Sequence, residues 1–230
     1  MAAGRIKIQT FLSRLPLFRA LAAPELERLA LGTSEVYLAR GDVVFHKGDP
    51  CVGFHAVVYG QVKLVFASPQ GTEKVIEIMG PGSSFGEPIM FMDKPYIMQA
   101  QTLADTMLLH VSKAAVDDEL GRDPRFARRM IAGLSRKLNA LIYDLEAYSL
   151  HSGTQRVIGY LLRGEPESAP ATQPLKVTLS ANKATIASRL NLTPEHFSRI
   201  LHDLAQQALI TVEGRQILIH DIERLRAIGV

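Results

Sequence analysis

The sequence predicts an α+β fold with three parts in chain order: an N-terminal β-roll, one long helix, and a C-terminal unit of short helices and a β-hairpin. Up to about residue 110, short apolar runs alternate with Gly and Pro turns, which is typical of a barrel, roll or sandwich. A helical spacing of Ile and Leu then runs from 131 to 145. Helix-capping residues and a glycine turn follow after residue 180. We expect domain boundaries at 1–113, 114–150 and 151–230.

Composition sets the class of protein before any motif is considered. The chain has 230 residues, of which 47% are hydrophobic and 21% charged, as in ordinary globular proteins. It has no apolar run of membrane-spanning length, and its N-terminus lacks the apolar stretch of a signal peptide. The single cysteine, Cys51, cannot form an internal disulfide. We therefore expect a cytoplasmic protein without a membrane segment. The net charge of +3 permits nucleic-acid binding but does not argue for it.

The predicted β-roll follows a short helix that opens on Pro24. Its strands are short runs rich in Val, Ile and Phe, each ended by a turn signal such as Lys47-Gly48-Asp49-Pro50 or Gly80-Pro81-Gly82. The expected strands are Val43–Phe45, Phe54–Tyr59, Val62–Phe66, Val75–Met79 and Met107–Val111.

The predicted long helix carries an apolar seam. Its positions alternate in spacings of three and four residues, the pattern of a helix that packs against a parallel copy of itself. The alternative is a helix that packs on its own domain, which usually shows a wider apolar stripe. We favour a homodimer, with a hinge at 151–154 after the helix. The seam residues are Ile131, Leu134, Leu138, Leu141 and Leu145.

Two capping signals mark a helix-turn-helix. Asn182 can cap a helix that runs to Leu190, and Asn191 tolerates the left-handed conformation of a tight turn. Thr193 offers a second cap and Pro194 a first-turn residue, so a new helix begins there. Two short helices joined by such a turn make a helix-turn-helix.

A β-hairpin follows the second helix, with Gly214 at its turn, and makes the motif a winged helix-turn-helix. Glu195, Ser198 and Arg199 share the outer face of the second helix. Arg pairs with guanine O6 and N7, Glu accepts from cytosine N4, and Ser is less selective, which suits double-stranded DNA. The alternative is a surface helix with an i, i+4 Glu–Arg pair. No HExxH, GxSxG, P-loop or CxxC motif is present, so we expect no enzyme.

The stretch from Thr193 to Leu201, Thr-Pro-Glu-His-Phe-Ser-Arg-Ile-Leu, resembles the recognition helix of the CRP/FNR family, and the likeness covers nearly the whole chain. It implies a cyclic-nucleotide-binding-like β-roll, a long dimerisation helix, and RNA polymerase as a partner. The Glu-x-x-Ser-Arg form implies the FNR-like palindrome TTGAT-N4-ATCAA, with Arg199 on guanine, Glu195 on the paired strand and Ser198 on thymine. Lys183 and Arg215 fall where relatives contact phosphates.

The resemblance breaks in the sensor. Family members that bind cyclic nucleotides have Gly-Glu followed by Arg-Ser, whereas this chain has Gly86-Glu87 followed by Ile97-Met98. The Thr-Ser pair that meets adenine is replaced by Leu141-Ile142. A phosphate beside Ile97 would lose its charge partner, so we expect no cAMP. The iron–sulfur cluster of FNR needs four cysteines, and this chain has one.

The candidate effector pocket thus consists of six positions: Gly86, Glu87, Ile97, Met98, Leu141 and Ile142. Nearby Met and Phe residues either fill core space, which is their commonest use, or line an adaptable pocket. The segment Met90–Pro95 is similar to the Dnr-type branch, which responds to nitric oxide through haem. A haem would need an axial His or Met, and His55, His110 and His151 are candidates; the alternative for each is that it binds no haem, and no other metal is expected. The open alternatives are another small ligand, or an interaction protein without DNA activity.

Overall fold

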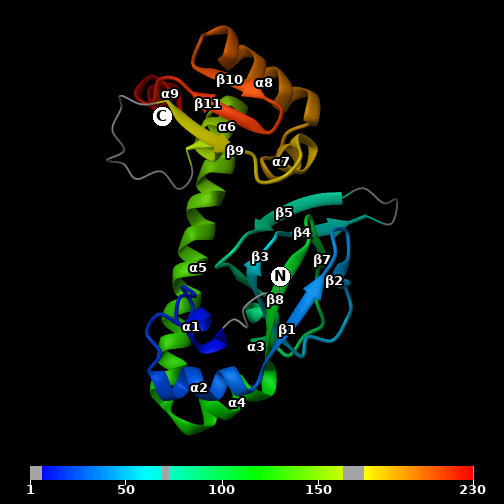
Figure 1. The fold of residues 1–230 in the computed structure, drawn as a ribbon, viewed down its shortest axis with the longest axis vertical. Coiled ribbons are helices and arrows are strands. Elements are labelled where there is room, and N and C mark those ends of the chain that lie inside the picture. The colour runs from blue at the N-terminus through cyan, green and yellow to red at the C-terminus, as the bar shows by residue number, and fades with distance from the viewer. Residues whose placement is uncertain (1–6, 69–72, 163–173, 230) are drawn as a thin grey trace. The chain divides into compact units, whose positions relative to one another are not determined.

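A computed structural model describes residues 7–68, 73–162 and 174–229, apart from the side chains of residues 140, 143, 144 and 146–149 (Figure 1). The chain divides into two compact units, residues 1–140 and 141–230. Each unit is described by itself. None of the described helices has the length and apolar character needed to cross a membrane.

The first unit combines helices with antiparallel strands. In chain order it holds α1 (Ile8–Leu12), α2 (Ala23–Leu31), β1 (Thr33–Leu38), β2 (Val43–Phe45), β3 (Gly53–Tyr59), β4 (Val62–Ala67), β5 (Glu73–Met79), β6 (Ser84–Phe85), α3 (Glu87–Phe91), β7 (Gln99–Thr102), β8 (Thr106–Ser112), α4 (Lys113–Arg122) and most of α5 (Pro124–Leu150).

The strands form two antiparallel sheets in the described part of this unit, with orders β1-β8-β3-β6 and β2-β7-β4-β5. The register pairs Thr33 with Val111 and His55 with His110. Both sheets join strands that are far apart in the sequence, as a roll requires. The predicted α+β fold class with an N-terminal β-roll is confirmed. All five predicted strands are present, whereas β1, β6 and β7 were not predicted.

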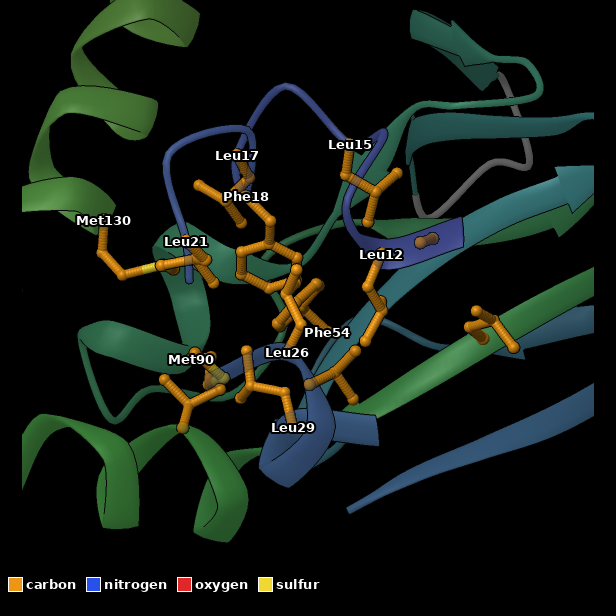
Figure 2. Close-up of a cluster of buried hydrophobic side chains, with 14 of the residues drawn as sticks. Leu12, Leu15, Leu17, Phe18, Leu21, Leu26, Leu29, Phe54, Met90 and Met130 are labelled. Carbon is orange, nitrogen blue, oxygen red and sulfur yellow. The ribbon is translucent and has the colours of Figure 1, made fainter. Parts of the chain in front are cut away.

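Because side chains alternate along a strand, β3 serves two cores. Phe54 and Ala56 belong to a cluster between the first sheet and the helices. Val57 belongs to a cluster between the two sheets, with Phe45 and Tyr96. Figure 2 shows the first cluster, in which Phe18 and Phe54 meet edge to face with ring centroids 5.7 Å apart. Other members drawn there include Leu12, Leu26, Leu29, Met90 and Met130.

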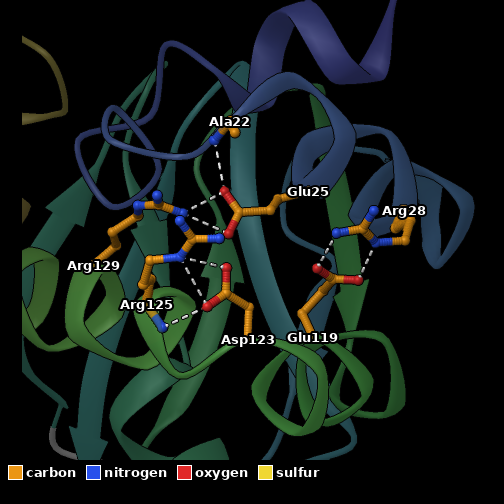
Figure 3. Close-up of polar contacts among 7 residues, drawn as sticks. All are labelled: Ala22, Glu25, Arg28, Glu119, Asp123, Arg125 and Arg129. Carbon is orange, nitrogen blue, oxygen red and sulfur yellow. Dashed lines mark hydrogen bonds and ion pairs between the residues drawn. The ribbon is translucent and has the colours of Figure 1, made fainter.

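Buried ion pairs tie the helices of the first unit together (Figure 3). Glu25 of α2 is 4% exposed and accepts from Arg129 of α5 at 2.6 Å and from the Ala22 backbone N–H at 2.6 Å. Glu119 of α4 is 1% exposed and accepts two hydrogen bonds from Arg28 of α2. Hydrogen bonding from Arg28 lowers the pKa of Glu119 below its ordinary value, so it stays ionised at neutral pH.

The first half of α5 lies directly on the N-terminal segment. A Cβ added at Gly133 would stand 2.8 Å from Leu17 Cδ1 and 3.0 Å from the Leu17 carbonyl oxygen. Arg136 donates to the Pro16 carbonyl at 3.1 Å. Only a residue without a side chain allows this approach, which explains a glycine in the interior of a long helix.

The second unit is built around three capped helices and a small sheet. After the end of α5 it holds α6 (Gly153–Leu161), β9 (Leu175–Thr178), α7 (Lys183–Arg189), α8 (Pro194–Gln206), β10 (Ile210–Glu213), β11 (Gln216–Ile219) and α9 (Ile222–Gly229). The strand order is β10-β11-β9, which adds an unpredicted strand, β9, to the predicted hairpin. Apolar side chains of all four helices are buried in it, among them Val157, Ile186, Phe197 and Leu225.

The segment after α5 is shorter than the hinge expected at 151–154. α5 ends at Leu150 and α6 already begins at Gly153. Ser152 caps α6 by accepting from the Gln155 backbone N–H at 3.2 Å, while the Gln155 side chain accepts from the Ser152 N–H at 2.8 Å. This reciprocal capping box draws two of the four expected hinge residues into the helix.

Candidate functional site

Three polar residues that the sequence marks for the helix-turn-helix fix the starts of α7 and α8 and the turn between them. Asn182 accepts from the Thr185 N–H at 2.8 Å, and Thr193 accepts from the His196 N–H at 3.2 Å. Asn191 has φ +56°, the left-handed conformation that Asn tolerates better than most residues. Pro194 occupies the first turn of α8. These contacts fix where α8 begins and therefore which side chains its first turns present.

α8 divides into a buried and an exposed face. Phe197, Ile200, Leu201 and Leu204 are each at most 4% exposed. Glu195, Ser198 and Arg199 are all exposed. Within the part of the chain that the structure describes, these three side chains form no hydrogen bond or ion pair. The Glu–Arg pair considered as an alternative is therefore not formed, and all three side chains are open to solvent.

Two more polar residues continue the same face. His202 and Gln206 are exposed, and the Gln206 amide nitrogen lies 3.0 Å from His202 Nε2. The sequence analysis assigned no role to either residue. The spacing of seven and eleven residues from Glu195 was the available signal, because such positions return to one side of a helix.

The hairpin β10–β11 forms the wing, with Gly214 at φ +61°. Arg215 at its turn donates to the carbonyl oxygens of Leu179 and Ser180, both at 2.9 Å, just before α7. The Arg215 carbonyl in turn accepts from the Leu179 N–H at 2.8 Å. Arg215 therefore attaches the wing to the helix-turn-helix, while its exposed guanidinium keeps further N–H donors. Lys183, in the first turn of α7, is half-buried.

A buried ion pair occupies the Gly86-Glu87 turn. Gly86 has φ +101° and precedes α3, so a side chain at this position would be strained. Glu87 is 0% exposed and accepts from Lys137 of α5 at 2.8 Å through Oε1. Lys137 also donates to the carbonyl oxygen and hydroxyl of Ser84. Glu87 Oε2 is buried without a partner among the described groups. The sequence did not indicate Lys137, which lies fifty residues away.

The other four candidate pocket residues differ in burial and in the unit to which they belong. Ile97 is 47% exposed and Met98 is half-buried, in the segment before β7. Leu141 and Ile142 are 56% and 55% exposed and belong to the second unit. The ammonium of Lys137 is thus the only side-chain cation recorded at the described Glu87 turn.

Two of the three candidate haem ligands lie inside the roll. His55 is 8% exposed and its ring stacks on Phe85, with centroids 5.3 Å apart. Phe45 and His110 flank it at 5.9 and 4.9 Å. Burial lowers the pKa of His55 to about 3, with a smaller effect from His110, and burial also lowers the pKa of His110. Both rings are therefore neutral at physiological pH.

These histidines do not fit a haem in this arrangement. His55 Nδ1 is a buried atom without a partner among the described groups, but the rings of Phe45, Phe85 and His110 have their centroids only 4.9–5.9 Å from its own, so a porphyrin could reach it only by displacing them. His151 is exposed just beyond α5. Over the described residues, no group of three or more His, Cys, Asp or Glu side chains is placed to hold a metal ion.

The seam of α5 is largely exposed. Ile131, Leu138, Leu141 and Leu145 are between 56% and 64% exposed. Leu134 differs, because it is half-buried against the core of the first unit. Leu134 therefore follows the alternative considered above, packing on its own domain, while four apolar side chains of the seam remain uncovered in a single chain.

Comparison with known proteins places both units. A family model described as "Cyclic nucleotide-binding domain" matches residues 35–123, and one described as "Crp-like helix-turn-helix domain" matches residues 155–228. The chain is 26% identical over 219 residues to the CRP-like cAMP-activated global transcriptional regulator of Mycobacterium tuberculosis, covering 93% of this chain and 96% of that protein.

Two solved structures add to this. The chain is 32% identical to DNR from Pseudomonas aeruginosa, with 99% of each chain covered and a TM-score of 0.55. It is similar in fold to FixK2 from Bradyrhizobium japonicum, with a TM-score of 0.74 at 22% identity, covering 86% of this chain and 98% of that one. Because the similarity extends to several branches, it does not single out the Dnr-type branch.

Proposed function

Because the chain belongs to the CRP/FNR family of DNA-binding transcription regulators, whose members are not enzymes, we propose that it reads an FNR-like palindrome as a homodimer under the control of a small molecule. The observation that carries this proposal is the outer face of α8. Glu195, Ser198 and Arg199 are exposed, without partners among the described residues, and lie in the first two turns of a helix fixed by the Thr193 cap. N-terminal turns of recognition helices are the part that contacts base edges.

The assay is fluorescence anisotropy with a duplex containing TTGAT-N4-ATCAA. Arg199→Ala should weaken binding by roughly 1–3 kcal/mol for each half-site and should abolish the preference for the half-site guanine. Arg224→Ala, which removes the same charge from α9, is the matched control and should leave that preference intact. An equal loss on all duplexes in the Arg199 variant would contradict base reading. Lys183→Ala should instead reduce the slope of log K against log salt concentration by about one.

The exposed seam of α5 supports the homodimer. Four apolar side chains with more than half of their surface exposed are costly in water, and a second copy of the helix would cover them. Leu138→Lys should shift sedimentation from dimer to monomer. Leu134→Lys should instead unfold the first unit, because Leu134 packs on its own core. If the Leu138→Lys protein sediments as the wild type does, the seam is not the dimer interface.

The ion pair at Glu87 supports an effector other than a cyclic nucleotide. All three Lys137 donors are engaged by Glu87 and Ser84. An anionic phosphate could take Lys137 only by stranding the fully buried Glu87 carboxylate, which is unfavourable. Cyclic AMP at 100 times its Kd would add about 2.7 kcal/mol of stability. We expect 1 mM cyclic AMP to leave the melting temperature unchanged, and a rise of several degrees would refute this.

Haem with nitric oxide remains the second effector hypothesis, carried by the overall similarity to DNR rather than by the histidines. An absorbance spectrum of protein reconstituted with haem tests it directly. A Soret band that shifts on adding nitric oxide, and loses that shift in His151→Ala, would support haem held by the exposed histidine. RNA polymerase is the proposed downstream partner, and in vitro transcription from a promoter with the palindrome would show activation or repression.

A further inference from the structure

The exposed face of α8 extends past the three residues assigned to base reading. Successive residues of an α-helix are rotated by about 100° around its axis. On α8 the average direction of the four buried side chains is therefore opposite to that of Glu195. His202 and Gln206 then lie within about 30° of the middle of the outer face, whereas Ser198 lies about 70° from it. If that face contacts DNA, His202 lies closer to the middle of the contacting face than Ser198, which is already assigned to base reading.

The contact between His202 and Gln206 fixes what His202 can offer. An amide nitrogen can only donate, so Gln206 donates to His202 Nε2 across the 3.0 Å separation. The neutral imidazole then carries its proton on Nδ1. Among the described residues, Nδ1 has no hydrogen-bond partner. His202 is therefore held as a single donor aimed away from Gln206.

The position of His202 along the helix selects its target. It lies three residues beyond Arg199, about 4.5 Å along the axis, which is close to the 3.4 Å step between base pairs. In an FNR-like half-site, both base pairs next to the guanine contain an adenine, whose N7 is a major-groove acceptor. The Nδ1 donor of His202 can therefore meet an adenine N7 acceptor one base pair away from the guanine.

We propose that His202, held by Gln206 as a positioning residue, donates through Nδ1 to the N7 of a purine in the base pair adjacent to the guanine read by Arg199. The inference rests on the proposed DNA-reading function and adds a fourth base-reading side chain to it. Gln206 acts through His202, because its hydrogen bond sets the protonated nitrogen.

The test uses the full-length protein and the tightest duplex selected from a random-sequence pool. Each purine flanking the half-site guanine is replaced in turn by its 7-deaza analogue, which removes N7 and leaves base pairing intact. For the wild-type protein, one such replacement should weaken binding about three- to tenfold. In His202→Phe, which keeps a ring without a donor, the same replacement should have no effect. Gln206→Leu should give an intermediate loss confined to that purine.

One control variant and the contrary outcomes make the test decisive. Gln207→Ala removes a neighbouring exposed glutamine that lies off the outer face and should bind as wild type. If His202→Phe weakens binding equally on all duplexes, or no 7-deaza purine matters to the wild type, the inference is overturned. If Arg199→Ala keeps its guanine preference, or the pool is not enriched at all, the proposed function itself fails.

Discussion

Removal of the Lys137 ammonium should destabilise the first unit more than removal of the Glu87 charge. Glu87 is 0% exposed, whereas the Lys137 side chain is 34% exposed. In Lys137→Met, which keeps the stem volume, the carboxylate loses its only recorded counter-ion while Oε2 is already without a described partner. Breaking a buried pair in this way costs about 3–5 kcal/mol. In Glu87→Gln the ammonium keeps Ser84 and reaches solvent, so the cost should be about 1–2 kcal/mol.

Urea denaturation measures the difference. The chain has no tryptophan, so circular dichroism together with tyrosine fluorescence follows the transition. Lys94→Met, at an exposed position, controls for the change of residue type and should stay within about 0.5 kcal/mol of wild type. The double variant should be more stable than Lys137→Met alone, because the unpaired charge is gone. If Glu87→Gln costs as much as Lys137→Met, the reasoning from unequal burial is wrong.

Three further predictions concern the scaffold. Arg28 lowers the pKa of Glu119 below its ordinary 4.5, so the stabilising pair is complete above that value and is lost as pH falls through the lowered pKa. The difference in unfolding free energy between wild type and Glu119→Gln should therefore shrink below about pH 4.5 in urea titrations. A difference that stays constant with pH would contradict the pairing. Asn191→Val should cost about 1–2 kcal/mol more than Asn191→Gly in melting experiments, because both variants lose the Asn side chain but only Val is strained at φ +56°; equal losses would argue against backbone strain. Gly133→Val should cost about 1–3 kcal/mol by clashing with Leu17, and a neutral result would show that α5 can move away.

The sequence predicted best those elements whose signals are local. The Asn182 and Thr193 caps, the Asn191 turn and the Gly214 wing each depend on residues within a few positions, and each is confirmed. The strands β1 and β7 were missed because their residues are mostly polar and half-buried, so neither shows a strong apolar alternation. Their pairing with distant strands is a tertiary effect, which a local pattern does not record.

The same limit applies to the site. The exposed residues of α8 follow from helical periodicity, so the three base-reading candidates could be named. The Lys137–Glu87 pair joins positions fifty residues apart and had no sequence signal. Leu134 keeps the seam spacing, yet it is half-buried because Gly133 beside it lets α5 approach Leu17. Spacing alone could not show which seam residue the chain would cover itself.

The pairing of β1 with β8 has a consequence for how the chain folds. Thr33 meets Val111, and Arg129 of α5 must reach Glu25 of α2, so the first unit closes contacts across most of its own length. In the second unit the starts of α6, α7 and α8 depend on neighbouring residues, because each helix is capped by a side chain three positions from its donor. Distant pairings form slowly and local ones quickly. During synthesis the roll should therefore stay open until α5 has emerged, whereas the helices that follow should form almost as soon as they are made.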